Sequence, residues 1–204
     1  MLSSIHPFGE RSRNNQFAGT AIAHVFASTL GGLILGVLAG GVGALLTSVL
    51  AIPSTARTAI VFVAAGIATI LEATKRERIL PTRARQVNEN WIQTYRGWIY
   101  GAGFGAELGF GISTIITTTL VHLLVVTMVL LGDPVTTAFL GALFGLVRGA
   151  TLLAGARVDS PERLRAFHQR LDQFRDRSRA GAVASLGAAT AVGLWAVAGL
   201  GSLL

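Results

Sequence analysis

Long apolar runs separated by short polar segments dominate the hydropathy pattern of the chain. Residues 17–50, 58–71 and 181–204 contain no Asp, Glu, Lys or Arg. Residues 97–131 are interrupted by one such residue, Glu107, and residues 135–156 by one, Arg148. Because about 20 apolar residues cross a hydrocarbon layer of ~30 Å, this pattern predicts an all-α, polytopic membrane protein.

We predict five transmembrane helices in a single domain that covers residues 1–204. The expected spans are 17–50, 58–73, 97–131, 135–156 and 181–204, and the basic segments between them are 74–96 and 157–180. The two longest runs have more residues than one crossing needs. Their surplus fits a broken helix, a tilted helix or an interfacial turn, and their glycine clusters are where a helix bends most easily.

The basic residues predict the orientation of the chain in the membrane. Of the 17 Lys and Arg, all but Arg57 and Arg148 fall before the first span, after the second or after the fourth. Five successive crossings place all these segments on one side. Because positively charged loops stay in the cytoplasm, we expect a protein of the cytoplasmic (inner) membrane with its N-terminus inside and its C-terminus outside.

Residues 160–179 are expected to form a cytoplasmic amphipathic helix. Ser160, Pro161 and Glu162 are typical of a helix start, and apolar side chains then recur at helical spacing among arginines. Such a helix fits the surface of a bilayer with anionic lipid, although a solvated linker has the same charge pattern. A protein partner or a homo-oligomer stays open, whereas the short basic segments between apolar runs argue against nucleic acid.

The composition excludes several kinds of chemistry. There is no cysteine, so thiol redox activity and thiolate metal sites are absent. No set of His and carboxylate residues has metal-ligand spacing, and no nucleophile stands beside a base. We therefore predict no metal, no cofactor and no enzymatic activity.

Three ionisable residues inside the spans are candidates for a polar site. At 1.5 Å per residue, Glu107 would lie about 15 Å from the cytoplasmic end of its span, Arg148 about 12 Å and His24 about 10 Å. A transporter would bind an anion at Arg148 or move a proton between His24 and Glu107. The alternative is structural: Glu107 and Arg148 form a buried pair that fixes helix register, and His24 bonds a backbone carbonyl.

Hydroxyl side chains mark the middle of the expected third span. Ser113, Thr114 and Thr117, followed by Thr118 and Thr119, are candidates for lining a permeation path. The other interpretation is that these hydroxyls bond to their own helix or pack against a neighbouring one.

Residues 100–156 resemble the fourth and fifth membrane helices of the CcdA and DsbD transmembrane family, which belongs with the LysE-like transporters. The resemblance rests on GAGFGAELGFGISTII, a proline turn, and AFLGALFGLVRGATLL. Residues 17–71 resemble the second and third helices of that family, and residues 181–204 would be the sixth. Electron-carrying members have a cysteine beside a proline, whereas this chain has Ile112-Ser113-Thr114-Ile115, so thiol transfer does not carry over.

The resemblance also makes the N-terminus a point of interest. Residues 3–11 resemble the cytoplasmic tail of the family's first helix, which implies an abbreviated start or a shortened member. His6, Glu10 and Arg11 then become candidates for a re-entrant polar motif, and solvated terminal residues are the alternative. Runs 17–50 and 97–131 also suggest a parallel internal repeat. The related family instead repeats three helices in inverted orientation, and we prefer the inverted repeat as the expectation for this chain.

The resemblance and the matched depths together favour a small LysE-like transporter or exporter of unknown substrate. The alternative is a non-transporting membrane scaffold or assembly factor, of the kind used in cytochrome c or respiratory complex biogenesis.

Overall fold

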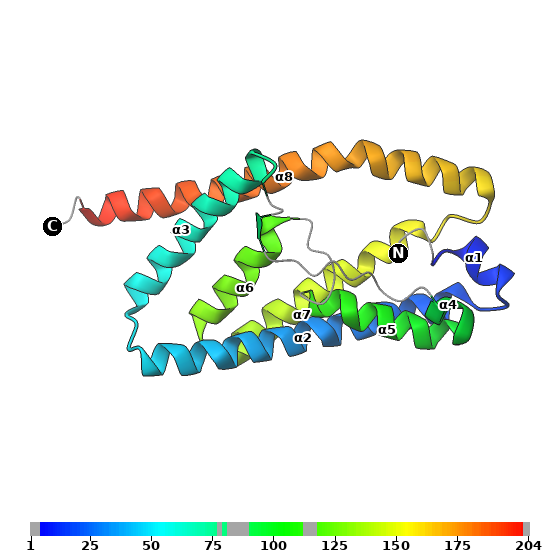
Figure 1. Cartoon of the computed structure of the whole chain (residues 1–204), viewed down its shortest axis with the longest axis horizontal. Helices are drawn as coiled ribbons and strands as arrows, with labels where there is room; N and C mark the ends of the chain where they lie inside the picture. Colours follow the sequence, from blue (N-terminus) through cyan, green and yellow to red (C-terminus); the bar gives the residue numbers. More distant parts are fainter. Residues whose placement is uncertain (1–4, 77–78, 81–89, 112–117, 202–204) are drawn as a thin grey trace.

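The structure is a computed structural model that describes residues 5–76, 79–80, 90–111 and 118–201. All regular elements in these ranges are helices, which confirms the all-α prediction (Figure 1). In chain order they are α1 (Pro7–Ser12), α2 (Phe17–Val49), α3 (Ser54–Ala73), α4 (Asn90–Thr94), α5 (Gly97–Phe110), α6 (Thr119–Leu131), α7 (Pro134–Ala150), η2 (Thr151–Gly155) and α8 (Pro161–Gly201).

Three of the described helical segments are long and apolar enough to cross a membrane. They are Phe17–Val49, Ser54–Ala73 and Pro134–Gly155, the last of which joins α7 to η2. Large apolar side chains also remain exposed along α2, among them Ile22, Phe26 and Leu38. Since a water-soluble bundle would bury such side chains, lipid is the solvent that suits this surface.

Helix α2 is the centre of the bundle, and α5 and α7 pack along its length (Figure 1). Its buried face consists mainly of small residues, so the helix backbones touch directly. A Cβ atom added at Gly31 would lie 2.5 Å from the carbonyl oxygen of Ala106 on α5, and one added at Gly36 would collide with the backbone of Thr137 on α7. Such close contact of small residues is how helices associate in lipid.

The packing of α2 on α5 is parallel and keeps a constant register. Gly101 meets the backbone of Thr20, Gly105 that of His24, and Gly109 that of Ser28. The two segments of the suggested parallel repeat are therefore direct neighbours.

The run 97–131, expected as one span, contains two separate helices. Helix α5 ends at Gly111, which has a φ of 72°, and α6 begins at Thr119. The 14 residues of α5 and the 13 of α6 make helices of roughly 20 Å each. Each is shorter than a hydrocarbon layer of about 30 Å, so the surplus length of this run belongs to a broken helix.

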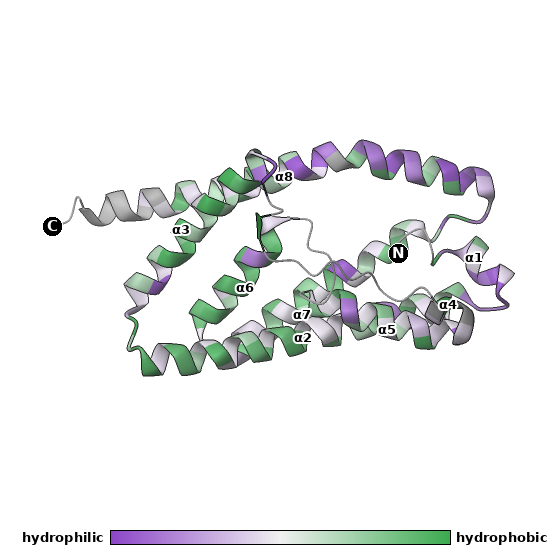
Figure 2. Ribbon diagram, viewed as in Figure 1, coloured by the Kyte–Doolittle hydropathy of each residue, from purple (hydrophilic) through white to green (hydrophobic). Residues whose placement is uncertain are grey.

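Helix α3 lies between α6 and α8 (Figure 1), and α6 also packs on α2, where Gly43 meets the backbone of Val129. Helix α8 is 41 residues long and joins the arginine-rich segment to the last apolar run without interruption (Figure 2). Residues 179–182, Arg-Ala-Gly-Ala, include no proline, and a single glycine is tolerated inside a helix. The sequence predicts two elements here, a cytoplasmic helix at 160–179 and a span at 181–204. In a single straight helix that crosses the bilayer, the 20 residues before the span would extend about 30 Å from the membrane surface along the helix axis.

Candidate functional site

The N-terminus of α6 is bound by a carboxylate from α3. The Glu72 side chain is 3% exposed, and its Oε2 accepts hydrogen bonds from the backbone N and the Oγ1 of Thr119, both at 2.8 Å. The Thr118 hydroxyl donates to the same oxygen at 3.3 Å. The first N–H groups of a helix lack partners within the helix and carry its positive dipole end. Glu72 satisfies one of these groups and matches that charge.

The C-terminus of α6 is bound by a cation from the same helix α3. The Nη1 atom of Arg57 donates to the carbonyl oxygens of Leu130 and Leu131, each at 3.3 Å. The Nε atom of Arg57 is buried and makes no hydrogen bond within the described part of the chain.

Arg148 on α7 lies against the C-terminal end of α5. Its Nη1 would be 3.6 Å from a Cβ atom built on Gly111, and its guanidinium covers the ring of Phe144 at 5.3 Å. Within the described ranges, Nη1 is buried without a hydrogen-bond partner. A cation at this position suits the negative dipole end of α5.

The predicted pair of Glu107 and Arg148 is not formed. The ion pairs recorded among the described residues join Arg13 to Glu10 and Arg163 to Asp159. Since Gly101, Gly105 and Gly109 define the face of α5 that touches α2, a residue two positions from Gly105 lies about 200° around the helix. Glu107 is therefore turned away from α2. Equal depth in two helices did not imply equal direction.

His24 adopts the structural alternative. It is 3% exposed, and its Nδ1 lies 3.2 Å from the carbonyl oxygen of Gly101. One turn further along α2, the Ser28 hydroxyl donates to the carbonyl oxygen of Gly145 at 2.7 Å. These bonds tie α2 to α5 and α7, and His24 does not share a site with Glu107.

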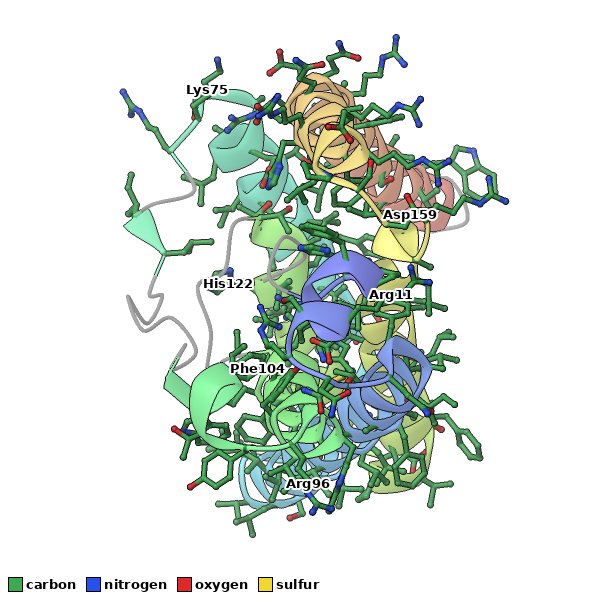
Figure 3. All side chains as sticks on the ribbon, turned by 90° about the vertical axis from the view of Figure 1, so that its right-hand side faces the viewer. Arg11, Lys75, Arg96, Phe104, His122 and Asp159 are labelled. Carbon is green, nitrogen blue, oxygen red and sulfur yellow. The ribbon has the colours of Figure 1, made fainter. Side chains whose placement is uncertain are left out.

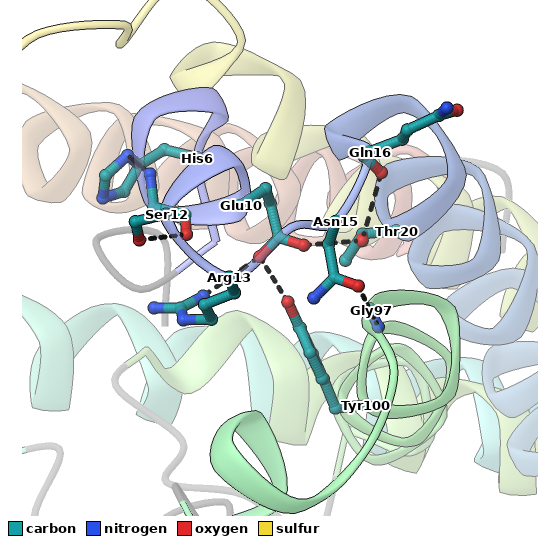
Figure 4. A network of polar contacts seen from close by, with 10 residues as sticks. His6, Glu10, Ser12, Arg13, Asn15, Gln16, Thr20, Gly97 and Tyr100 are labelled. Atoms are coloured by element: carbon teal, nitrogen blue, oxygen red, sulfur yellow. Dashed lines mark hydrogen bonds and ion pairs between the residues drawn. The ribbon is translucent and has the colours of Figure 1, made fainter.

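A second polar cluster, which the N-terminal segment forms with α2 and α5, surrounds Glu10 (Figure 4). The Glu10 side chain is fully buried, at 0% exposure. Its Oε1 accepts from Arg13 Nη1 at 3.1 Å and from the Tyr100 hydroxyl, and its Oε2 accepts from Thr20 Oγ1 at 2.9 Å. Next to this cluster, Asn15 Oδ1 accepts from the backbone N of Gly97 at 3.2 Å.

The N-terminal segment is built into the fold, so solvated terminal residues are the wrong interpretation for two of its three candidates. His6 is 6% exposed, and its Nδ1 accepts from the backbone N of Gly9 at 3.0 Å, which caps α1. Burial, together with the positive charge of Arg13, lowers the pKa of His6. Arg11 is exposed, and the arginine that binds Glu10 is Arg13.

The remaining candidates lie at the interruption between α5 and α6. Ser113, Thr114 and Thr117 fall outside the described residues. Glu72, which binds Thr118 and Thr119, was missed because it stands at the end of an uncharged run and resembles the start of the polar segment that follows. In the part of the chain that the structure describes, no three His, Asp or Glu residues form a possible metal site.

Comparison with known proteins adds no relative: no family model, curated protein or solved structure matches this chain. The functional argument therefore depends on the residues themselves.

Proposed function

We propose that the chain is a small transporter of the LysE-like kind, placed in the cytoplasmic membrane with its N-terminus inside and its C-terminus outside. It acts without a cofactor and performs no covalent chemistry. The proposal is supported by the apolar helices, by the arginine-rich connections and by one feature of the fold.

That feature is the interruption between α5 and α6, whose two facing ends lie near charges from different helices. Arg148 from α7 lies at the end of α5, and Glu72 from α3 binds the start of α6. Broken helices in transporters expose backbone groups near the middle of the membrane, where substrates and coupling ions bind. A buried ionisable group without a partner is a functional candidate in a membrane helix, and Arg148 Nη1 meets that description among the described residues.

The packing suggests which parts would move against each other. Helices α2, α5 and α7 form one closely packed unit through their small residues, and the C-terminal half of α6 joins it where Gly43 meets the backbone of Val129. The N-terminal end of α6, next to the interruption, is bound instead by Glu72 from α3. A movement of α3 and this end of α6 relative to α5 would open the region around Arg148 to one side and then to the other.

The test is transport by purified protein reconstituted in liposomes. Charge movement on solid-supported membranes would be recorded during jumps to small carboxylates, phosphate, sulfate and amino acids. We expect an anion to give a current in the wild type that Arg148→Leu abolishes and that the exposed, charge-matched Arg165→Leu retains. The proposal would be contradicted if the wild type gave no current with any solute, or if Arg148→Leu gave the same currents as the wild type.

The scaffold function remains the second candidate, because one face of the polar half of α8 is exposed among the residues that the structure describes. The polar half of α8 projects its side chains outward (Figure 3), and two members of its apolar stripe, Leu171 and Phe174, are 36% and 56% exposed. Purification in mild detergent distinguishes the two functions. A stoichiometric partner that is lost when Phe167 and Phe174 are changed to serine would favour the scaffold, and a protein that purifies alone would not.

A further inference from the structure

A cavity of about 350 Å³ lies between the N-terminal half of α3 and the C-terminal half of α6. Its lining is partly polar and partly apolar: Ser54, Arg57, Thr58, Val61, Phe62, Thr127, Leu130 and Leu131. It stands at the end of the bundle where α3 begins and α6 ends, opposite to the arginine-rich connections. Arg57 is the one basic residue of the sequence expected on that side.

Arg57 gives this cavity a positive charge. Its Nη1 is committed to the carbonyl oxygens of Leu130 and Leu131, and these bonds hold the guanidinium in place. The ion pairs among the described residues do not include Arg57, so its positive charge has no carboxylate partner there. An anionic ligand in the cavity would neutralise that charge. Guanidinium binds phosphate and carboxylate oxygens especially well.

The start of α3 adds to the preference for an anion. Ser54 lines the cavity and is the first residue of the helix, and Pro53 at the N-cap makes no side-chain hydrogen bond. The N-cap residue therefore supplies no side-chain acceptor to the first-turn N–H groups of α3. The positive dipole end of α3 lies beside the cavity.

On α3, the polar residues of the lining precede the apolar ones. Ser54 and Arg57 belong to the first turn, whereas Val61 and Phe62 lie about one turn beyond Arg57, further into the apolar run. A molecule that fills the cavity thus meets a cation near the membrane surface and hydrocarbon at greater depth. This is the order of groups in a phospholipid and not in a small soluble anion.

We propose that the cavity binds the phosphate of an anionic phospholipid at Arg57, with an acyl chain along Val61 and Phe62. The lipid phosphate pairs with the positive charge of the Arg57 guanidinium, while Nη1 keeps its bonds to α6. The bound lipid joins α3 to α6 at the end of the bundle. The site is separate from Arg148 and does not depend on transport.

The test compares lipid retention in native mass spectrometry after transfer from nanodiscs of phosphatidylglycerol or phosphatidylcholine. The wild type is expected to retain one phosphatidylglycerol and to retain phosphatidylcholine at least about tenfold less. Arg57→Gln should lose the bound phosphatidylglycerol by a similar factor. Thr58→Phe should also lose it, because the larger side chain fills the cavity while Arg57 keeps its bonds to α6. Thr58 is exposed, so the larger ring does not disturb the core.

The control is Arg11→Gln, which removes the same charge from an exposed position outside the arginine-rich segment of α8. Equal loss of lipid in Arg11→Gln and Arg57→Gln would show a general charge effect and overturn the proposal. Retention of phosphatidylglycerol by Thr58→Phe would place the lipid elsewhere. A third arm measures thermal stabilisation by inorganic phosphate. Stabilisation equal to that by phosphatidylglycerol would identify a small anion as the ligand and would likewise overturn the lipid assignment.

Discussion

Glu72 and Arg57 lie roughly four turns apart on α3 and bind opposite ends of α6. The carboxylate meets the end of α6 where the helix dipole is positive, and the guanidinium meets the end where it is negative. If α6 ran the other way, both charges would face the wrong pole. The two residues therefore specify the antiparallel direction of α6 on α3.

The first prediction concerns Glu72. Glu72→Ala leaves the N–H and hydroxyl of Thr119 without their buried acceptor, so it should lower the free energy of unfolding by about 1–3 kcal/mol. Thermal unfolding in detergent measures the change. Glu162→Ala, at an exposed position of α8, removes a carboxylate of the same kind and should have little effect. Equal melting temperatures for the two variants would show that Glu72 does not stabilise α6.

The sequence predicted the helical class and the apolar runs, because burial in lipid depends on composition over about 20 residues, which can be counted directly. It also allowed a broken helix in run 97–131. It did not predict the position of the break, which depends on a positive φ at Gly111, one glycine among several in that run.

The site was harder to predict than the fold, since pairing depends on direction as well as depth. Glu107 and Arg148 have similar depths, but the ion pairs recorded among the described residues do not join them. The predicted N-terminal motif of His6, Glu10 and Arg11 left out Arg13, whose side chain is the one that reaches the Glu10 carboxylate. That pair has i,i+3 spacing, whereas the bonds from Thr20 and Tyr100 to Glu10 depend on tertiary packing, which sequence spacing does not give.

The second prediction uses the glycines that separate α2 from its neighbours. Gly105→Ala would place a methyl group against the backbone carbonyl of His24, so it should force α5 away from α2 and destabilise the fold by about 1–3 kcal/mol. The matched control is Gly41→Ala in α2, where no atom lies within 4 Å of the new Cβ. That variant should be neutral or stabilising by up to about 1 kcal/mol, because alanine favours a helix. If both variants changed the free energy of unfolding in the same direction, the close-packing argument would be refuted.

The third prediction is a pH dependence of the docked N-terminal segment. Because the pKa of His6 is lowered from its ordinary value of 6.5, the folded state prefers the neutral ring. Its stabilising contribution is present above about pH 6.5 and falls as the pH decreases toward the lower, folded-state pKa. Protonation also places a hydrogen on the Nδ1 that accepts from Gly9. Hydrogen exchange of the α1 amides, corrected for the intrinsic rate, should therefore accelerate below pH 6.5.

His6→Asn is the control for this titration. An asparagine side chain caps a helix with its Oδ1 and does not titrate in this range, so α1 should stay docked with little pH dependence. Glu10, Arg13 and His168 also act on His6 electrostatically, and all three remain in the variant. If the α1 amides of His6→Asn showed the same pH dependence of exchange as those of the wild type, a group other than His6 would cause the effect.

The fourth prediction separates Arg13 from Arg11 around Glu10. Arg13→Gln removes a charged donor from a carboxylate that is 0% exposed, whereas Arg13 itself is 32% exposed. Solvent already weakens the pair, and the hydroxyls of Thr20 and Tyr100 still donate to Glu10, so we expect a loss of about 1 kcal/mol. Arg11→Gln should stay within about 0.5 kcal/mol of the wild type because its side chain is exposed.

In the background of Glu10→Gln, the difference between the two arginine variants should disappear, since the charge that distinguishes them is gone. Thermal unfolding of the three single variants, the two double variants and the wild type measures this coupling. A loss in Arg11→Gln as large as that in Arg13→Gln would mean that general surface charge, not the Glu10 contact, holds the N-terminal segment in place.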